Sequence, residues 1–326
     1  MATVRTVTVK ASCVDYTSLA SAEAGEQGNL VSLDRQLDIE CYASAAPDTT
    51  QVMFDGWTTD STRYIRVLTP LSERHDGKWN TSKYYMEHST TGDPGGVLAC
   101  REEYTIFEGL QIRNTKASPT EFNDCIYTEA RITVIKCITR GGYYGINVSI
   151  ANSEVRNSIA YGAVRGGYVR GFAGGSAAAY NCTFIGSQYG LNTDASVNYP
   201  IAKNVYAHGG TACYSNNGGA NLLTKTNCMS SDTTATNNAG GGGATNCTNN
   251  IAHDTNNFTN VTAGSEDYHI PTGSALKDAG VDLSGQFTDD IDGDTRSGTW
   301  DVGADEFTAG GGGGPTPIRS MPLMGI

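Results

Sequence analysis

The sequence predicts an all-β fold: a right-handed parallel β-helix with about 23 residues per turn and a short helix as its N-terminal cap. A short pattern, usually Asn followed by a small or apolar residue, returns at nearly constant spacing along the chain. The repeats carry no apolar period of 3.6 residues, which argues against helical repeats. Glycine is abundant, at 40 of 326 residues, but has no three-residue period that would indicate collagen. Hydrophobic residues make up 38% of the chain, enough for a core.

The N-terminal residues supply the expected cap. Residues 1–10 alternate apolar and polar side chains, which predicts a strand and not the apolar stretch of a signal peptide. Residues 15–24 offer Asp15 or Thr17 as an N-cap before an alanine-rich run, so we expect a short helix over the exposed first turn. The expected divisions are the strand and capping helix (1–28), the β-helix (29–262), a closing segment (263–307) and a glycine-rich linker with an apolar tail (308–326).

The repeat defines the expected turns. The second residue of the pattern lies at positions 112, 137, 158, 182, 205, 228 and 251, in steps of 25, 21, 24, 23, 23 and 23. Parallel strands stack about 4.8 Å apart, so residues one step apart should form a column that points inward. The preceding residue should lie at a bend, where Asn tolerates a left-handed backbone and stacked amides can hydrogen-bond. The expected ladder is Asn157, Asn181, Asn204, Asn227 and Asn250.

Nine cysteines, an odd number, follow none of the spacings of zinc sites. Cys137, Cys182 and Cys228 occupy alternate places in the inward column. Two steps of the column span about 9–10 Å, beyond the ~7 Å limit for the Cα atoms of a disulfide. We therefore expect these three to be buried, reduced and inert.

The closing segment contains a set of short motifs at residues 268–270, 274–280, 290–296 and 300–306. As a set, they resemble the closing segment of pectate-lyase-like β-helix proteins of phage and bacterial genomes. Residues 15–19 and the stretch from Gly56 to Trp79 are also similar to this group. The resemblance implies the fold and a phage virion protein, but the group has no uniform activity.

Three alternating aspartates in this segment, Asp290, Asp292 and Asp294, suggest Ca²⁺. Their spacing lacks the glycine and glutamate positions of an EF-hand loop. The alternative is a pair of Asp-Gly turns locked by Arg296, with Asp301, Asp305 or Glu306 as its partner. We predict no cofactor and no metal, and keep Ca²⁺ at the three aspartates as the alternative.

Catalysis has candidates but no complete motif. Asp194 and His208 lie in fragments similar to the Asn-x-Asp and Gly-His-Gly motifs of polygalacturonase-type hydrolases, whose further Asp pair and Arg-x-Lys are missing here. A lyase would use basic residues to grip an acidic glycan, and tyrosine faces could stack on sugars. The basic candidates are Arg140, Arg156, Arg165 and Arg170, and the tyrosines are Tyr143, Tyr144, Tyr161, Tyr168, Tyr189, Tyr199 and Tyr206. We predict no catalytic residue and keep Asp194 and His208 as the candidates.

Three features together lead to the predicted function: the rigid solenoid, the absence of an export signal and the C-terminal tail, with the phage origin implied by the resemblance alone. Five glycines precede a tail with the apolar residues Ile318, Leu323, Met324 and Ile326, which we expect to dock on another subunit. We predict a structural protein of a phage virion, a capsid decoration or tail appendage, made in the host cytoplasm. Its partners would be other virion proteins or copies of itself, with a surface polysaccharide as a further ligand.

Two alternatives stay open: a lyase or hydrolase acting on acidic polysaccharide, and an extracellular or cell-surface glycan-binding module. The net charge of −12 without a cluster of Lys and Arg argues against nucleic acid as a partner. The absence of an apolar run of about 18 residues argues against a membrane-spanning helix.

Overall fold

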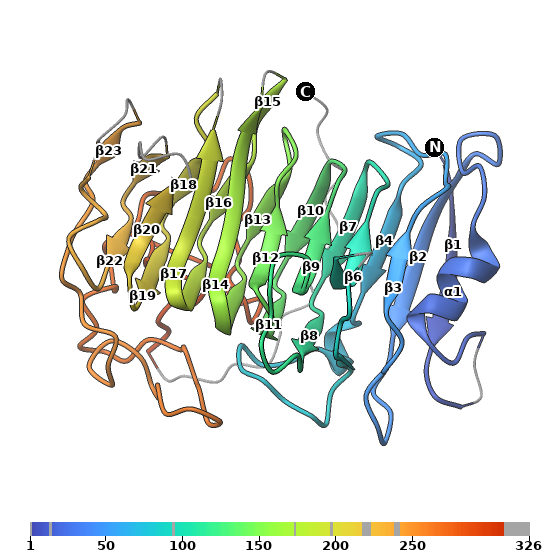
Figure 1. The fold of residues 1–326 in the computed structure, drawn as a ribbon, viewed down its shortest axis with the longest axis horizontal. Coiled ribbons are helices and arrows are strands. Elements are labelled where there is room, and N and C mark those ends of the chain that lie inside the picture. Colours follow the sequence, from blue (N-terminus) through green and yellow to red (C-terminus); the bar gives the residue numbers. More distant parts are fainter. Residues whose placement is uncertain are drawn as a thin grey trace.

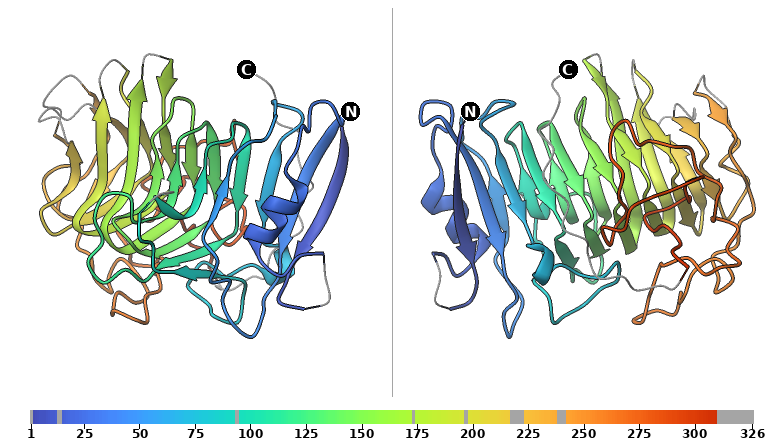
Figure 2. Two further views of the ribbon diagram at one scale, coloured as in Figure 1. Left: turned by 45° about the vertical axis from the view of Figure 1, so that its right-hand side comes forward. Right: turned by 180° about the vertical axis from the view of Figure 1, so that it is seen from behind.

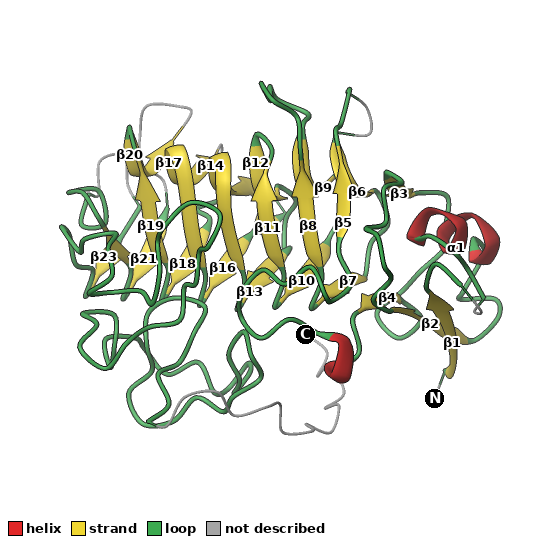
Figure 3. Cartoon of the chain, turned by 90° about the horizontal axis from the view of Figure 1, so that it is seen from below, coloured by secondary structure: helices red, strands yellow, loops and turns green. Residues whose placement is uncertain are grey.

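A computed structural model describes the chain as a solenoid of short strands. It describes residues 2–12, 15–92, 95–172, 174–195, 198–216, 223–237 and 242–309. Figure 1 shows the turns stacked from α1 at one end to β23 at the other, and Figure 3 shows the same stack from below. The predicted parallel β-helix is confirmed. The predicted docking residues Ile318, Leu323, Met324 and Ile326 lie outside the described residues.

One side of each turn belongs to a ten-stranded sheet. Neighbouring strands pair in parallel and in register, and their inward residues are apolar, as in the buried Leu37, Ile65 and Phe107. The strands, in spatial order, are β1 (Thr3–Val9), β2 (Arg35–Cys41), β4 (Ile65–Leu68), β7 (Thr105–Glu108), β10 (Ile132–Ile135), β13 (Glu154–Arg156), β16 (Ala178–Tyr180), β18 (Ile201–Lys203), β21 (Thr224–Thr226) and β23 (Ala244–Thr245).

A second sheet supplies the other two sides of each turn. Its long strands β14 and β17 each run along both sides, so β11 and β12 both pair with β14, and β19 and β20 both pair with β17. Only β15 pairs antiparallel among the described strands of the sheet. Its strands are β3 (Val52–Phe54), β5 (Met86–His88), β6 (Gly96–Cys100), β8 (Gln111–Asn114), β9 (Asp124–Thr128), β11 (Ile138–Gly141), β12 (Tyr144–Val148), β14 (Ile159–Phe172), β15 (Gly175–Ser176), β17 (Thr183–Ala195), β19 (Tyr206–Gly209), β20 (Ala212–Asn216) and β22 (Met229–Ser230).

The predicted capping helix is α1 (Leu19–Glu26), beside β1 at the N-terminal end in Figure 1. Its N-cap is Ser18, and not Asp15 or Thr17, because the Ser18 and Ser21 side chains and backbone amides bond reciprocally in a capping box. Leu19 is fully buried in the main core, so the helix covers the first turn. Within the part of the chain that the structure describes, the other helical element is the short 3₁₀ helix η1 (Leu71–Glu73).

The ladder is confirmed in its central turns. Asn157, Asn181, Asn204 and Asn227 have φ angles of 48°, 46°, 53° and 49°, so each lies in the left-handed region at the bend after the ten-stranded sheet. Register on both sides of the bend aligns Asn181 with Asn204, because Tyr180 pairs with Lys203 and Thr183 pairs with Tyr206.

The predicted repeat is wrong at its two ends, at Asn250 in the ladder and at position 112 in the inward column. Thr226 pairs with Thr245, so Asn246 and not Asn250 follows Asn227 in the column. At the other end, Glu108 pairs with Ile135, which places Gly109 and Leu110, and not Gln111 and Ile112, beside Lys136 and Cys137. Strand pairing fixes the register while the loops between turns change length, so a constant step fails where a loop is longer or shorter.

The column of cysteines is confirmed as buried. Cys137, Cys182 and Cys228 are free thiols with 0% exposure. The corrected register adds Cys247 directly beside Cys228, since Met229 pairs with Thr248. The expectation that two steps separate all column cysteines therefore fails for Cys228.

The ladder amides mostly do not bond to one another. Among the described residues, the Asn204 side chain donates to Asn181 Oδ1 at 2.9 Å, and it also donates to the carbonyl of Val281 at 2.8 Å. Asn157 and Asn227 donate to the carbonyls of Asp289 and Ala279. These acceptors belong to residues 276–306, which we call the C-terminal strap. The bend residues therefore attach the C-terminal strap to the solenoid.

The C-terminal strap lies against the outside of the later turns, as the red segment in the right-hand view of Figure 2 shows. Its own fold is locked by Arg296, which ion-pairs with Glu306 at 3.0 Å and donates to the carbonyls of Gly303 and Ala304. The predicted pairing of Arg296 is thus confirmed with Glu306 as its partner. A second apolar cluster, which includes Tyr206, Phe258 and Leu276, fills the space beneath.

The helices of the described residues are too short and too polar to cross a bilayer.

Candidate functional site

The catalytic candidates Asp194 and His208 lie apart. His208 pairs in register with Ile185, whereas Asp194 lies nine residues further along β17. Asp194 faces Arg170 at 3.7 Å, and His208 bonds to Ser231 Oγ at 2.6 Å and stacks on another histidine. The structure therefore does not assemble these two residues into one site.

The three candidate calcium ligands do not converge either. Asp290 is fully buried, and its Oδ1 accepts from the backbone amides of Asp292, Gly293 and Asp294 at 2.9 to 3.0 Å. Its Oδ2 accepts from the amide of Glu306 at 3.0 Å. Asp290 thus closes the turn, as the Asp-Gly alternative predicted, and Asp292 points elsewhere.

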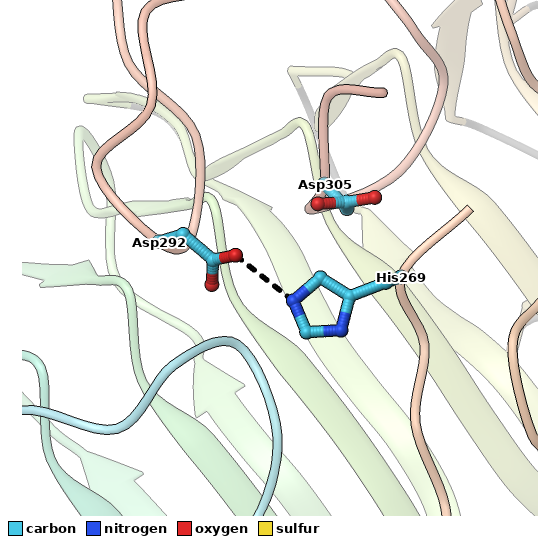
Figure 4. Close-up of side chains that lie close together, drawn as sticks. All are labelled: His269, Asp292 and Asp305. Carbon is cyan, nitrogen blue, oxygen red and sulfur yellow. Dashed lines mark hydrogen bonds and ion pairs between the residues drawn. The ribbon is translucent and has the colours of Figure 1, made fainter. Parts of the chain in front are cut away.

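Asp292 meets a histidine that the sequence did not single out (Figure 4). His269 bonds through Nε2 to Asp292 at 2.9 Å and through Nδ1 to Asp267, and Asp305 lies beside it. One ligand atom each from His269, Asp292 and Asp305 lies within 4.8 Å of the others. We call these four residues the histidine cluster.

Positive charge in the histidine cluster comes from His269 itself. Burial disfavours the charged imidazole, but the hydrogen bonds to Asp267 and Asp292 raise the pKa of His269 to about 11. A protonated imidazole has no lone pair to offer a metal. Lys78 adds a second positive charge, 3.5 Å from Asp267. In this charge state the residues form an internal salt bridge.

The histidine cluster joins two distant segments. Lys78 and Gly77 come from the loop between β4 and β5, whereas His269, Asp292 and Asp305 come from the closing part of the chain. Gly77 has φ +74°, and a Cβ there would collide with Asp292 Oδ1 and His269 Nε2. The cluster is thus a clasp that holds the loop against the C-terminal strap.

A different cluster lies on the long strands β12, β14 and β17, which are adjacent in the middle of the solenoid (Figure 1). The Arg165 guanidinium lies 4.8, 5.3 and 5.1 Å from the ring centroids of Tyr143, Tyr144 and Tyr189. It also donates to the Tyr144 hydroxyl at 2.6 Å. Tyr168 packs against Tyr144 at 4.9 Å. We call these five residues the tyrosine–arginine cluster.

Register explains why the cluster forms. Tyr144 pairs with Arg165, and Arg165 pairs with Tyr189, so one position on three consecutive turns carries a ring, a guanidinium and a second ring. Three residues further along, Asn147, Tyr168 and Asn192 form a second row. Within each row, neighbouring residues lie about 4.8 Å apart from one turn to the next, a spacing that suits ring–guanidinium stacking.

A buried carboxyl supports the cluster from the neighbouring turn. Asp124, 1% exposed, accepts from the amide of Tyr144 at 3.0 Å and from the Asn147 side chain at 2.9 Å. Burial raises the pKa of Asp124 to about 7. Asn192 donates to the Tyr144 hydroxyl at 3.2 Å. Neutral amides and a carboxyl of shifted pKa thus lie beneath the rings.

The cluster has a buried floor and a partly exposed rim. Tyr144 and Tyr168 are 6% and 8% exposed, whereas Tyr143, Arg165 and Tyr189 are half-buried. Sequence reasoning named all five residues, although under two separate hypotheses, sugar stacking and glycan gripping. It missed Asp124 and Asn147, because nothing in the local sequence distinguishes them from ordinary strand residues.

Comparisons with known proteins bear on the fold. No family model and no curated protein sequence matches the chain. Among solved structures, the chain is similar to the crystal structure of pectate lyase Pel9A, with a TM-score of 0.50 and 12% identity over 94% of this chain and 98% of that one. At this identity the likeness shows the fold alone. This protein has the parallel β-helix fold of that pectate lyase.

Proposed function

We propose that the protein binds a polysaccharide through the tyrosine–arginine cluster. The observation that carries the proposal is the stacking of one guanidinium against three tyrosine rings, with two of those rings and the guanidinium itself partly exposed. Ring faces pack on the C–H faces of sugars, and a guanidinium and amides bond to hydroxyl or carboxylate oxygens.

The shape of the solenoid supports a polymer as the ligand. Equivalent residues recur at every turn, about 4.8 Å apart along the stack. The rim residues Tyr143, Arg165 and Tyr189 follow this direction over adjacent turns. A chain of sugars could therefore lie along the turns and contact several of them. The similar structure is, by its name, an enzyme that acts on pectate, which is a polysaccharide.

Binding is better supported than cleavage. Asp124 is the carboxyl whose pKa burial raises to about 7 in this cluster, but it is 1% exposed. Both of its oxygens accept hydrogen bonds from Tyr144 and Asn147. A general acid or base must reach the proton that it transfers. Asp124 therefore supports the floor of the cluster, and a lyase or hydrolase is the second candidate.

The virion role stays a separate prediction. It depends on docking by residues 318–326, which lie outside the described residues. The likeness to a pectate lyase gives a virion location no support. A polysaccharide-binding solenoid is compatible with a virion and with a cell surface alike.

The test compares Arg165→Ala with a matched variant. Arg131→Ala removes another arginine that lies over a tyrosine ring, Tyr104, at 5.4 Å, but outside the cluster. Affinity electrophoresis and calorimetry against neutral and acidic polysaccharides should show weaker binding for Arg165→Ala alone. Equal binding by both variants and the unaltered protein would refute the proposal. Formation of unsaturated or reducing sugar ends during the assay would favour the second candidate.

A further inference from the structure

The last two turns place two cysteine side chains in direct succession. Thr226 pairs with Thr245, and the amide of Thr248 donates to the carbonyl of Cys228 at 3.0 Å. These contacts lie on both sides of the cysteines and so align Cys228 with Cys247. Adjacent parallel strands are about 4.8 Å apart, within the ~4.4–6.8 Å range of Cα separations in disulfides.

The two thiols have the same orientation. The Sγ atom of Cys228 contacts the carbonyl two residues earlier, that of Thr226, at 3.5 Å, and the Sγ atom of Cys247 contacts the carbonyl of Thr245 at 3.5 Å. Cys137 and Cys182 show the same contact with the carbonyls of their own strands. Side chains in this column therefore point the same way, and the thiols of Cys228 and Cys247 lie one above the other.

Cys228 and Cys247 differ from the other column cysteines in their neighbours. Ser158 separates Cys137 from Cys182, and Val205 separates Cys182 from Cys228. Those pairs are two turns apart and out of reach. Cys228 and Cys247 are one turn apart.

Their surroundings also differ from one another. Cys228 is fully buried, whereas Cys247 is partly exposed at the edge of the sheet, where β23 has only two residues. Hydrogen bonding from Cys228, with a smaller contribution from the charge of Lys225, holds the pKa of the Cys247 thiol below its ordinary value although burial opposes this. A thiolate is the reactive form of cysteine, so Cys247 is the thiol that an oxidant meets first.

We propose that Cys228 and Cys247 form a reversible disulfide that fastens the last turn of the solenoid to the turn before it. The reaction uses a low-molecular-weight disulfide such as oxidised glutathione. The Cys247 thiolate attacks one sulfur of that disulfide, forms a mixed disulfide and releases one glutathione thiolate. Cys228 then loses its proton and attacks Cys247 Sγ, which releases the second glutathione thiolate. Two protein thiols are oxidised and one glutathione disulfide is reduced.

The chain offers a direct readout of this bond. Trypsin cleaves after Lys225 and next after Lys277, so one peptide, residues 226–277, contains Cys228 and Cys247 and no other cysteine. The full-length native protein is incubated with oxidised glutathione, its remaining thiols are alkylated in denaturant, and the digest is analysed by mass spectrometry. We expect this peptide to be two hydrogens lighter than the reduced, unalkylated peptide. Dithiothreitol should restore both alkylation sites.

The controls separate the pair from general oxidation. Cys182, equally buried in the same column, should stay alkylatable throughout. Cys247→Ser should leave Cys228 alkylatable under the same oxidant, and the time course on the unaltered protein stands independently of that variant. The proposal is wrong if both thiols remain alkylatable, if Cys247 retains glutathione as the end product, or if Cys247 pairs with a cysteine outside the peptide.

Discussion

Two outer surfaces of the solenoid carry rows of polar side chains, and they differ in what covers them. The bend row of Asn157, Asn204 and Asn227 is covered by the C-terminal strap, and its amides bond to the strap's backbone. The tyrosine–arginine cluster has a rim that remains half-buried and accessible. Because the strap already occupies the bend row, a ligand must bind at the tyrosine–arginine cluster instead.

The surface that the strap covers also holds buried and partly buried ion pairs of the closing segment. Arg296 and Glu306 are buried together, and the histidine cluster joins the strap to the loop that contains Lys78. Buried ion pairs are costly to break because each leaves an uncompensated charge behind. The comparison therefore predicts that substitutions at the strap mainly reduce stability, whereas substitutions at the cluster rim mainly reduce binding.

The largest expected effect is at Arg296. The Arg296→Met variant leaves Glu306 buried without its ion pair. It also leaves the carbonyls of Gly303 and Ala304 without the donors that Arg296 supplies. The free energy of unfolding in urea should fall by about 3–5 kcal/mol. Arg131→Met, at an exposed site, should cost less than about 1 kcal/mol. Similar losses in the two variants would show that the strap contributes little to stability.

The bend row is the next test. Asn204→Ala removes the bonds of its side chain to the carbonyl and the amide of Val281. Asn246→Ala is the matched control, because Asn246 has φ 53° in the same column but is exposed. Both variants bear the cost of a left-handed backbone, so the difference reports the side-chain contacts of Asn204, which are two bonds with Val281 in the strap and one with Asn181. We expect Asn204→Ala to be less stable than its control by about 1–3 kcal/mol in urea unfolding.

These two sites show where sequence reasoning succeeds. Asn181, Asn204 and Asn227 could be aligned because their spacing is constant, and constant spacing follows directly from stacked strands. Asn250 was misplaced because a shorter loop brings Asn246 into the column, and loop length is invisible to a fixed step. The partner of each amide could not be predicted, since Asn157 bonds to Asp289, 132 residues away.

The candidate site, too, could be predicted only in part from the sequence. Tyrosines and arginines in neighbouring turns could be recognised as binding residues, but only the register places Arg165 between Tyr144 and Tyr189. Asp124 was missed because its environment comes from Tyr144 and Asn147 on the following turn. Likewise, His269 and Asp292 meet across two loops of irregular structure.

Each of the two surfaces contributes one buried carboxyl to the dependence of stability on pH. Burial raises the pKa of Asp305, in the strap, and of Asp124, beneath the cluster, from the ordinary 3.8 of an aspartate to about 7. Between these values the native state binds more protons than the unfolded chain, so the free energy of unfolding falls as pH rises through that window. His269, with its pKa raised from 6.5 to about 11, extends the decline above neutral pH.

Thermal unfolding should therefore give a higher Tm near pH 5 than near pH 8. Asp305→Asn and Asp124→Asn should each flatten part of this decline, because each removes one group that takes up a proton on folding. The two effects should add, since the residues lie on different surfaces and share no partner. If neither substitution changes the slope of Tm against pH, the assignment of both carboxyls is wrong.

The smallest effect on stability, and the sharpest test of the comparison, is at Tyr189. Its ring is half-buried at the rim, 5.1 Å from the Arg165 guanidinium, so Tyr189→Ala should change the free energy of unfolding by less than about 1 kcal/mol. Loss of one stacking face should weaken polysaccharide binding roughly 5- to 10-fold, equivalent to about 1–1.4 kcal/mol. Tyr189→Phe keeps the ring and should bind within about twofold of the unaltered protein, because stacking needs the face and not the hydroxyl. Calorimetric titration measures the affinities, and urea unfolding of the same samples measures stability. If Tyr189→Ala instead loses several kcal/mol of stability, its ring belongs to the packed structure and the cluster is no more accessible than the bend row beneath the strap.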